Sequence, residues 1–143
     1  MTVAAADKIE IQELLAELYW ELDSHRPEGW ANCFAPDGVF DGNKYGEFKG
    51  RAAIAGFIRS HIEKGNEDAS RHCLSNIRIR EAPGGAATVR TYVAKFRVDS
   101  RPGTFIAAAD LKADVKRVDG KWQIQRLELM APEILLGPNS KPK

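Results

Sequence analysis

The second half of the chain decides the fold. Residues 70–130 read SRHCLSNIRIREAPGGAATVRTYVAKFRVDSRPGTFIAAADLKADVKRVDGKWQIQRLELM. Apolar and polar side chains alternate in this stretch, as in Ile77-Arg78-Ile79-Arg80, which is typical of a strand with two different faces. Three turn sequences interrupt it, Pro83-Gly84-Gly85, Ser100-Arg101-Pro102-Gly103 and Asp119-Gly120. Because tight turns join antiparallel neighbours, the sequence predicts a four-stranded antiparallel meander with strands at 70–81, 86–99, 104–118 and 121–130.

Helices are predicted before the meander. The first, 7–23, carries five apolar residues at helical spacing and opens with Asp7 and Glu10, which fit a capping box. A second, short helix begins at Pro27 and ends before Pro36-Asp37-Gly38. The third spans 50–64, with Gly65 as its C-cap, and a short hairpin of 39–41 and 45–48 precedes it. The apolar residues of the first helix are Ile11, Leu14, Leu15, Leu18 and Leu22, and the second helix is predicted to carry Trp30, Cys33 and Phe34.

Composition restricts the class of protein. The 143 residues are enough for one domain with a single core, and 21 Lys and Arg against 20 Asp and Glu leave no excess charge to attract nucleic acid or an anionic membrane. The two cysteines, Cys33 and Cys73, form no disulfide framework. No signal peptide and no apolar run of about 20 residues is recognisable, so a soluble cytoplasmic protein is expected.

Helices followed by a curved meander predict an α+β architecture: a cone-shaped antiparallel sheet packed against N-terminal helices. Such a sheet leaves a hollow between its concave face and the helices, where a small-molecule site is expected. Its other face is not covered by any predicted helix, so a homo-oligomer, a dimer or a trimer, is expected.

The order of elements, with residues spread over nearly the whole chain, resembles the SnoaL-like, scytalone dehydratase-like family of the nuclear-transport-factor-2-like superfamily. This resemblance implies a single SnoaL-like domain over 1–143, with a core at about 7–131 and a C-terminal tail at 132–143. The residues that carry the resemblance are Ile11–Leu15, Tyr19–Asp23, Trp30, Phe34–Phe40, Phe48–Arg51, Ile54, Phe57, Arg71-His72, Ser75-Asn76, Ala87–Tyr92 and Arg117–Trp122.

The resemblance implies a catalytic pair, with His72 as the proton-transferring base and Asp23 as the residue that orients it. A neutral imidazole accepts a proton near neutral pH, and a carboxylate on its other nitrogen stabilises the imidazolium. The implied function is a cofactor-independent lyase of the dehydratase type, acting on a small apolar, aromatic or polyketide-like substrate. The alternatives are a ketosteroid-isomerase-like isomerase or polyketide cyclase, and a non-catalytic ligand-binding or accessory subunit.

The resemblance to individual members is incomplete. Scytalone dehydratase has two tyrosines that polarise the substrate, and their positions fall here on Leu22 and Gly42. Its second histidine falls near Arg97. Lindane dehydrochlorinase has an arginine in its last strand, and the corresponding position is Leu127. The base and its orienting carboxylate are therefore expected without the polarising groups of these enzymes.

Further residues are expected to contact the substrate. Tyr19 lies one helical turn before Asp23 and so on the same face. No metal is expected, because Asp23 and His25 have no third ligand nearby, and Cys73 should point to the sheet face opposite His72. The direction of Asp110 is left open. The expected substrate-binding residues are Tyr19, Trp30, Phe34, Tyr45, Tyr92, Phe96 and Arg97.

Overall fold

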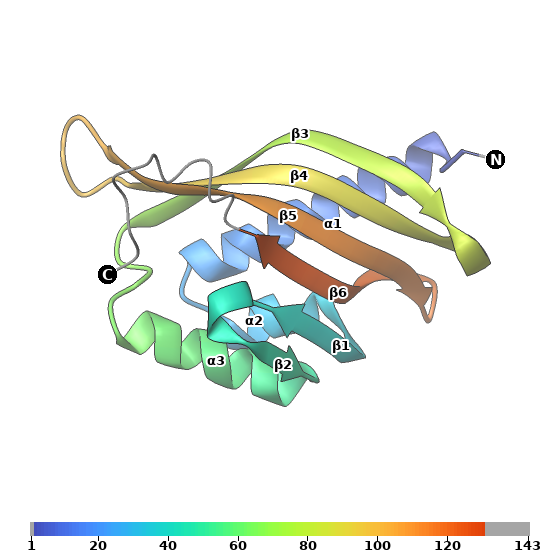
Figure 1. Ribbon diagram of the computed structural model, residues 1–143, viewed down its shortest axis with the longest axis horizontal. Helices are drawn as coiled ribbons and strands as arrows, with labels where there is room; N and C mark the ends of the chain where they lie inside the picture. The colour runs from blue at the N-terminus through green and yellow to red at the C-terminus, as the bar shows by residue number, and fades with distance from the viewer. Residues whose placement is uncertain (1, 131–143) are drawn as a thin grey trace.

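The computed structural model describes residues 2–130, so the expected tail at 132–143 lies outside the described part (Figure 1). Three helices and six strands form an α+β fold, as predicted. The helices are α1 (Ala5–Asp23), α2 (Pro27–Asn32) and α3 (Arg51–Glu63); the strands are β1 (Phe34–Asp41), β2 (Glu47–Lys49), β3 (Ser70–Ala82), β4 (Ala86–Arg97), β5 (Thr104–Val118) and β6 (Lys121–Met130).

The six strands form one curved sheet in the order β2-β1-β6-β5-β4-β3 (Figure 1). Strands β3 to β6 form the predicted antiparallel meander. One strand pair departs from the predicted antiparallel arrangement, because β1 pairs parallel with β6 and the sheet is therefore mixed. A parallel pair needs a long crossover, here the whole of α3 and β3 to β5, and no local turn sequence announces it.

Strand β1 begins earlier than predicted. Phe34, expected in the second helix, is the first residue of β1 and pairs with Ile124 of β6. The register then shifts before Val39, which pairs with Arg126. Pro36 lies in this bulge, where a residue without a backbone N–H does not break the ladder. Residues 36–38, which were predicted to end a helix, therefore form a bulge within β1.

The helices pack against the concave side of the sheet and enclose the core (Figure 1). Its aromatic centre consists of Trp30, Phe34 and Phe40, with the Trp30 ring centroid 5.0 Å from each of the other two. Trp30 and Phe34 are 2% and 0% exposed. Side chains of this size contribute strongly to stability when buried. Within residues 2–130, no helix combines the length and the apolar character that a membrane crossing needs.

The first helix begins at Ala5, two residues before the predicted capping box. Its N-cap, Ala4, makes no side-chain cap hydrogen bond, so the capping-box prediction was wrong. Asp7 instead lies in the first turn, where it accepts hydrogen bonds from Trp122 Nε1 at 3.1 Å and from Arg117. Asp7 therefore ties the start of α1 to the β5–β6 turn.

An Asp7→Ala variant is expected to lower the free energy of unfolding by about 1–2 kcal/mol, because the indole N–H and the guanidinium lose a charged acceptor. Urea denaturation measures this loss. Glu13→Ala, which removes an exposed carboxylate from the same helix, is the control and should change stability by less than about 0.5 kcal/mol. Equal effects of the two variants would contradict the assigned role of Asp7.

Candidate functional site

The structure brings the side chains of Asp23 and His72 together. Asp23 is the last residue of α1, and His72 is the third residue of β3. Asp23 Oδ1 lies 2.6 Å from His72 Nδ1, and Asp23 Oδ2 accepts the backbone N–H of His72 at 3.0 Å. Both side chains are about nine-tenths buried. Two contacts from one carboxylate fix both the strand and the imidazole ring.

The hydrogen bond to Asp23 determines where the imidazole carries its hydrogen. An ionised carboxylate only accepts, so Nδ1 must be the donor and, in the neutral ring, Nε2 keeps its lone pair. The Asp23–His72 pair can therefore take up a proton at Nε2 while Asp23 stabilises the resulting imidazolium.

Tyr19 forms one wall of the imidazole site. Its ring stacks on that of His72 with centroids 4.9 Å apart and an angle of 28° between the planes. Burial raises the pKa of the Tyr19 hydroxyl far above its ordinary value, and the charges of Glu67 and Asp23 raise it further. Tyr19 is therefore a neutral phenol throughout the physiological range, and its stacking restricts rotation of the imidazole.

A second buried carboxylate, Glu67, lies on the other side of His72. It belongs to the connection between α3 and β3, yet it is only 3% exposed. Its Oε1 atom is 3.0 Å from Lys95 Nζ and 3.1 Å from His61 Nε2, and its Oε2 atom is 3.8 Å from His72 Nε2. Glu67 was not predicted from the sequence, because Asn66-Glu67-Asp68 has the composition of an ordinary solvated loop.

The loop that carries Glu67 is held from several directions. His25 Nε2 lies 2.8 Å from the Glu67 carbonyl oxygen, and Lys95 Nζ also donates to the carbonyl of Asn66. Backbone strain accompanies these contacts, because His25 and Ala69 have positive φ angles of 59° and 49°. Non-glycine residues adopt such angles only where surrounding contacts enforce them.

The charges around Glu67 affect the pH dependence of stability. Burial alone would raise the pKa of Glu67, but hydrogen bonds from His61 and Lys95 and the positive charge of Lys95 lower it below its ordinary 4.5. Ionised Glu67 therefore stabilises the fold above about pH 4.5, and this contribution is lost as the pH falls through the lowered pKa of the folded state.

A Glu67→Gln variant is expected to be about 1–3 kcal/mol less stable than wild type near pH 7, because Lys95 loses its charged acceptor. The difference should shrink as the pH falls from about 5 to 3, where wild-type Glu67 also becomes neutral. Urea unfolding at several pH values measures both effects. A constant difference over this range would contradict the lowered pKa.

Asp23, Glu67 and His72 place potential metal-ligand atoms within 4.8 Å of one another. The donor set does not favour a cation. Asp23 is already engaged by Nδ1 of His72, and Lys95 already supplies a positive charge to Glu67. A divalent ion at this place would lie beside an ammonium group, which Coulomb repulsion disfavours.

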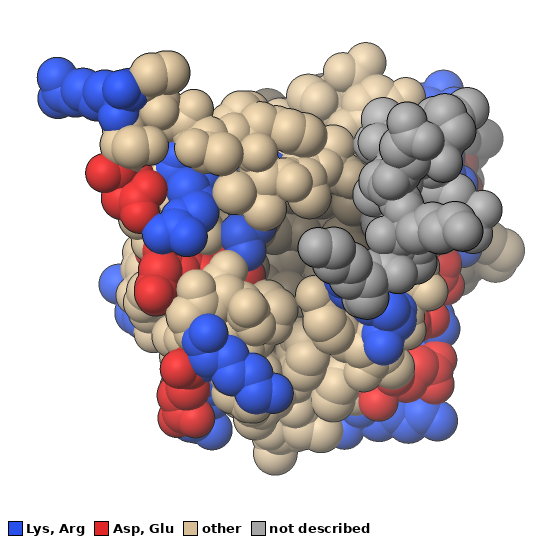
Figure 2. All heavy atoms as spheres, turned by 60° about the vertical axis from the view of Figure 1, so that its left-hand side comes forward, with Lys and Arg blue, Asp and Glu red and all other residues tan. Residues whose placement is uncertain are grey.

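The Asp23–His72 pair lies at one end of the sheet, where α3 ends and β3 begins (Figure 1). Figure 2, in which this end comes forward, shows a hollow in the surface with charged atoms along one side. A separate cavity of about 240 Å³ lies at the ends of β1 and β6 and is lined by Asp41, Asn43, Glu128, Leu129 and Met130.

Comparison with known proteins places this geometry in a family. The family model described as "SnoaL-like domain" matches residues 3–128. The chain belongs to the SnoaL-like family. No functionally curated protein matches the chain.

Solved structures agree with the SnoaL-like assignment and confirm the cystatin-like, NTF2-like fold. A protein of unknown function with a cystatin-like fold from Nostoc punctiforme is 27% identical, with a TM-score of 0.79 over 92% of this chain and 96% of that one. An NTF2-like protein from Novosphingobium aromaticivorans is 26% identical, with a TM-score of 0.79 over 90% and 83%. A protein from the same organism that carries the provisional name scytalone dehydratase is 24% identical, with a TM-score of 0.72 over 88% and 84%.

In this SnoaL-like domain, the residues predicted to bind substrate do not all gather around His72. Tyr19 contacts it directly. Trp30 and Phe34 were predicted to line a pocket, but both side chains are buried in the hydrophobic core. Tyr45 is 43% exposed in the turn between β1 and β2, and its ring lies 5.5 Å from that of His61, which contacts Glu67.

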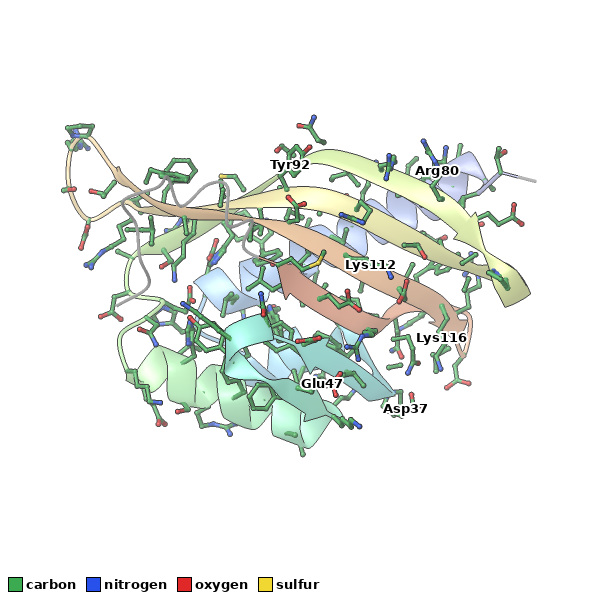
Figure 3. All side chains as sticks on the ribbon, in the orientation of Figure 1. Asp37, Glu47, Arg80, Tyr92, Lys112 and Lys116 are labelled. Carbon is green, nitrogen blue, oxygen red and sulfur yellow. The ribbon has the colours of Figure 1, made fainter. Side chains whose placement is uncertain are left out.

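Strand register places two of the predicted substrate contacts on the sheet face opposite His72. His72 pairs with Lys95, so Lys95 shares its sheet face, whereas Tyr92 and Phe96 lie on the opposite face of β4. Tyr92 is 53% exposed and lies over the sheet, away from α3 (Figure 3). Phe96 packs edge-on against Phe105, 5.6 Å away.

Arg97 and Asp110 form ion pairs with residues other than Asp23 and His72. Arg97, at the end of β4, is exposed and forms an ion pair with Asp99 at 2.6 Å. Asp110 pairs in register with Tyr92 and lies 3.8 Å from Arg90. Asp110 is therefore on the outer face, where a pocket of about 230 Å³ is lined by Asn76, Arg78, Arg90, Thr91, Tyr92 and Asp110.

Proposed function

We propose that the protein is a cofactor-independent lyase in which His72 removes a proton from a carbon atom of a small apolar substrate. The observation that carries this proposal is the 2.6 Å hydrogen bond between Asp23 Oδ1 and His72 Nδ1. It leaves Nε2 as the only basic atom of the ring and supplies a counter-charge for the imidazolium.

The reaction is an elimination. The C–H bond breaks as the Nε2–H bond forms, and the electron pair moves into a new double bond while a group leaves from the neighbouring carbon. A hydroxyl group leaves as water after receiving the proton from Nε2, so the atoms balance and His72 returns to its neutral form. Loss of a small carbonyl fragment is compatible with the same base.

The substrate class follows from the surroundings of His72 and from the family. Tyr19 presents an aromatic face at the site, and a low local dielectric strengthens the imidazolium–carboxylate interaction. The positions of the polarising tyrosines and arginine of better-known relatives are occupied by Leu22, Gly42 and Leu127, and both leucines are buried. An aromatic or polyketide-like compound whose own carbonyl acidifies the C–H bond suits such a site.

An isomerase or a cyclase would use the same proton removal without a leaving group. An accessory ligand-binding subunit would bind a ligand without removing a proton.

The protein is proposed to act as a cytoplasmic homo-oligomer. Support for the oligomer comes from apolar side chains that are 44–57% exposed on or beside β4 and β5, namely Tyr92, Val98, Phe105 and Ile106.

A deuterium-exchange assay tests proton removal without knowledge of the leaving group. The wild-type protein in D₂O is incubated with a panel of aromatic ketones and β-hydroxy ketones, and NMR follows exchange of the acidic C–H and formation of the alkene. Exchange is expected with at least one member, and His72→Ala should reduce it by about 10²–10⁴-fold.

The control is Cys73→Ala, which changes the neighbouring, exposed residue of β3 and should leave exchange unchanged. Exchange that persists at the wild-type rate in His72→Ala would refute the proposed base. Alkene formation distinguishes the lyase from an isomerase, and saturable binding without exchange would identify a non-catalytic binding protein.

A further inference from the structure

The Oε2 atom of Glu67 has no hydrogen-bond partner within residues 2–130, although it is buried. The other oxygen of the same carboxylate contacts both Lys95 and His61. A buried carboxylate oxygen without a donor from the protein is costly, so the groups that face it determine how its charge is stabilised. The next question is which nearby group could donate a hydrogen bond to Oε2.

His72 Nε2 lies 3.8 Å from Glu67 Oε2. In the resting state this nitrogen carries a lone pair, because Asp23 holds the hydrogen on Nδ1. Two acceptors face each other and cannot form a hydrogen bond. Protonation of His72 converts Nε2 into a donor, and a shift of about 1 Å would then bring the two atoms to the distance of a charge-assisted hydrogen bond.

We propose that Glu67 is a positioning residue that accepts the Nε2–H of His72 once the imidazole has taken a proton from the substrate. This inference rests on the proposed function of His72 and specifies how the site holds the proton between its removal and its delivery. The substrate C–H bond breaks, the Nε2–H bond forms, and Glu67 remains a carboxylate throughout.

The charges around the pair suit this role. The groups that face His72 and Glu67 are Tyr19 and Asp23 from α1, His61 from α3, Lys95 from β4 and His25 from the connection after α1. With His72, His61 and His25 neutral, Asp23, Glu67 and Lys95 leave one net negative charge. Protonation of His72 neutralises the cluster, whereas without the Glu67 charge it would create a net positive charge in a buried place.

The Glu67 loop is also rigidly placed for this contact. The Glu67 carbonyl contacts His25, and the carbonyl of Ala69 accepts the backbone N–H of Val98 at 2.9 Å. His25 and Ala69, which make these two contacts, both have positive φ angles. An acceptor that is already in position needs little reorganisation when charge develops on the imidazole.

NMR of the full-length protein tests the inference without a substrate. The chain has three histidines, so single variants assign their Cε1–H signals. In wild-type protein with His72 protonated, the imidazolium should show a downfield, slowly exchanging Nε2–H signal. In Glu67→Gln this signal should lose its downfield shift, because a neutral amide is a weaker acceptor than a carboxylate.

Glu63→Gln is the matched control, because it neutralises an exposed carboxylate at the end of α3 and should leave the His72 signals unchanged. Glu67→Asp keeps the charge but withdraws the carboxylate from Nε2, so the downfield shift of the Nε2–H signal should be lost in this variant as well. If Glu67→Gln does not fold, the Nε2–H signal of Glu67→Asp tests the proposed contact between Glu67 and His72.

Unchanged His72 signals in Glu67→Gln, or a wild-type-like Nε2–H signal in Glu67→Asp, would overturn the inference. The result is independent of the exchange assay. Failure of C–H exchange in wild type would refute the lyase and leave the Glu67 contact to be decided by NMR. Unchanged His72 signals in Glu67→Gln, with intact exchange in wild type, would refute the Glu67 contact and leave the lyase standing.

Discussion

An Asp23→Asn variant is expected to fold like the wild type and to lose proton-transfer activity by about 10²–10⁴-fold. The amide oxygen can still accept the backbone N–H of His72, which Asp23 Oδ2 accepts at 3.0 Å. The amide NH₂ then faces Nδ1 and donates to it. The hydrogen of the neutral ring moves to Nε2, so the basic lone pair is lost at the atom that meets the substrate.

Deuterium exchange and thermal unfolding should be measured together for Asp23→Asn, because loss of activity is meaningful only if the fold survives. Asp68→Asn, which changes an exposed carboxylate in the α3–β3 connection, is the control and should keep wild-type exchange. The ¹⁵N shifts of His72 report the tautomer directly. Retained activity with a changed tautomer would show that proton transfer does not depend on Nε2.

A Trp30→Ala variant is expected to lose about 3–5 kcal/mol of stability, the largest effect on folding among these predictions. Trp30 is 2% exposed, and its ring contacts those of Phe34 and Phe40, so truncation leaves a cavity between α2 and β1. Collapse around the cavity can reduce the loss but cannot restore the aromatic contacts.

Trp20 provides a matched control for Trp30. It is also a tryptophan in a helix, but it is 67% exposed on α1, so Trp20→Ala should change stability by less than about 0.5 kcal/mol. Urea denaturation compares the two variants. A small loss of stability for Trp30→Ala, together with weakened ligand binding, would instead support the predicted position of Trp30 on a pocket wall.

The sequence was sufficient for those parts of the fold that local signals specify. Turn sequences gave the meander because each turn joins neighbouring strands, and α3 begins after Gly50, whose φ angle of 82° favours glycine. The parallel pairing of β1 with β6 was not predictable in this way. It depends on burial of Phe34 and Phe40 against elements far along the chain, and Pro36-Asp37-Gly38 locally resembles a turn.

Only those site residues that the family resemblance indicates could be predicted from the sequence. The resemblance indicated Asp23 and His72, which the structure brings together. Tyr92 and Phe96 were misplaced because the inward face of β4 depends on its register with β3, which sets His72 opposite Lys95. Glu67 escaped notice because its burial results from partners on α3, β4 and the connection after α1, and a single loop glutamate gives no sign of them.

The position of β3 gives the Asp23–His72 contact a second consequence. β3 is the last strand of the sheet, so its outward backbone groups are available to another chain. At His72 the outward N–H is already occupied by the Asp23 carboxylate from α1. The residue that orients the proposed base therefore also closes part of an open strand edge, and selection against strand addition between molecules would favour Asp23 independently of any chemistry at the imidazole.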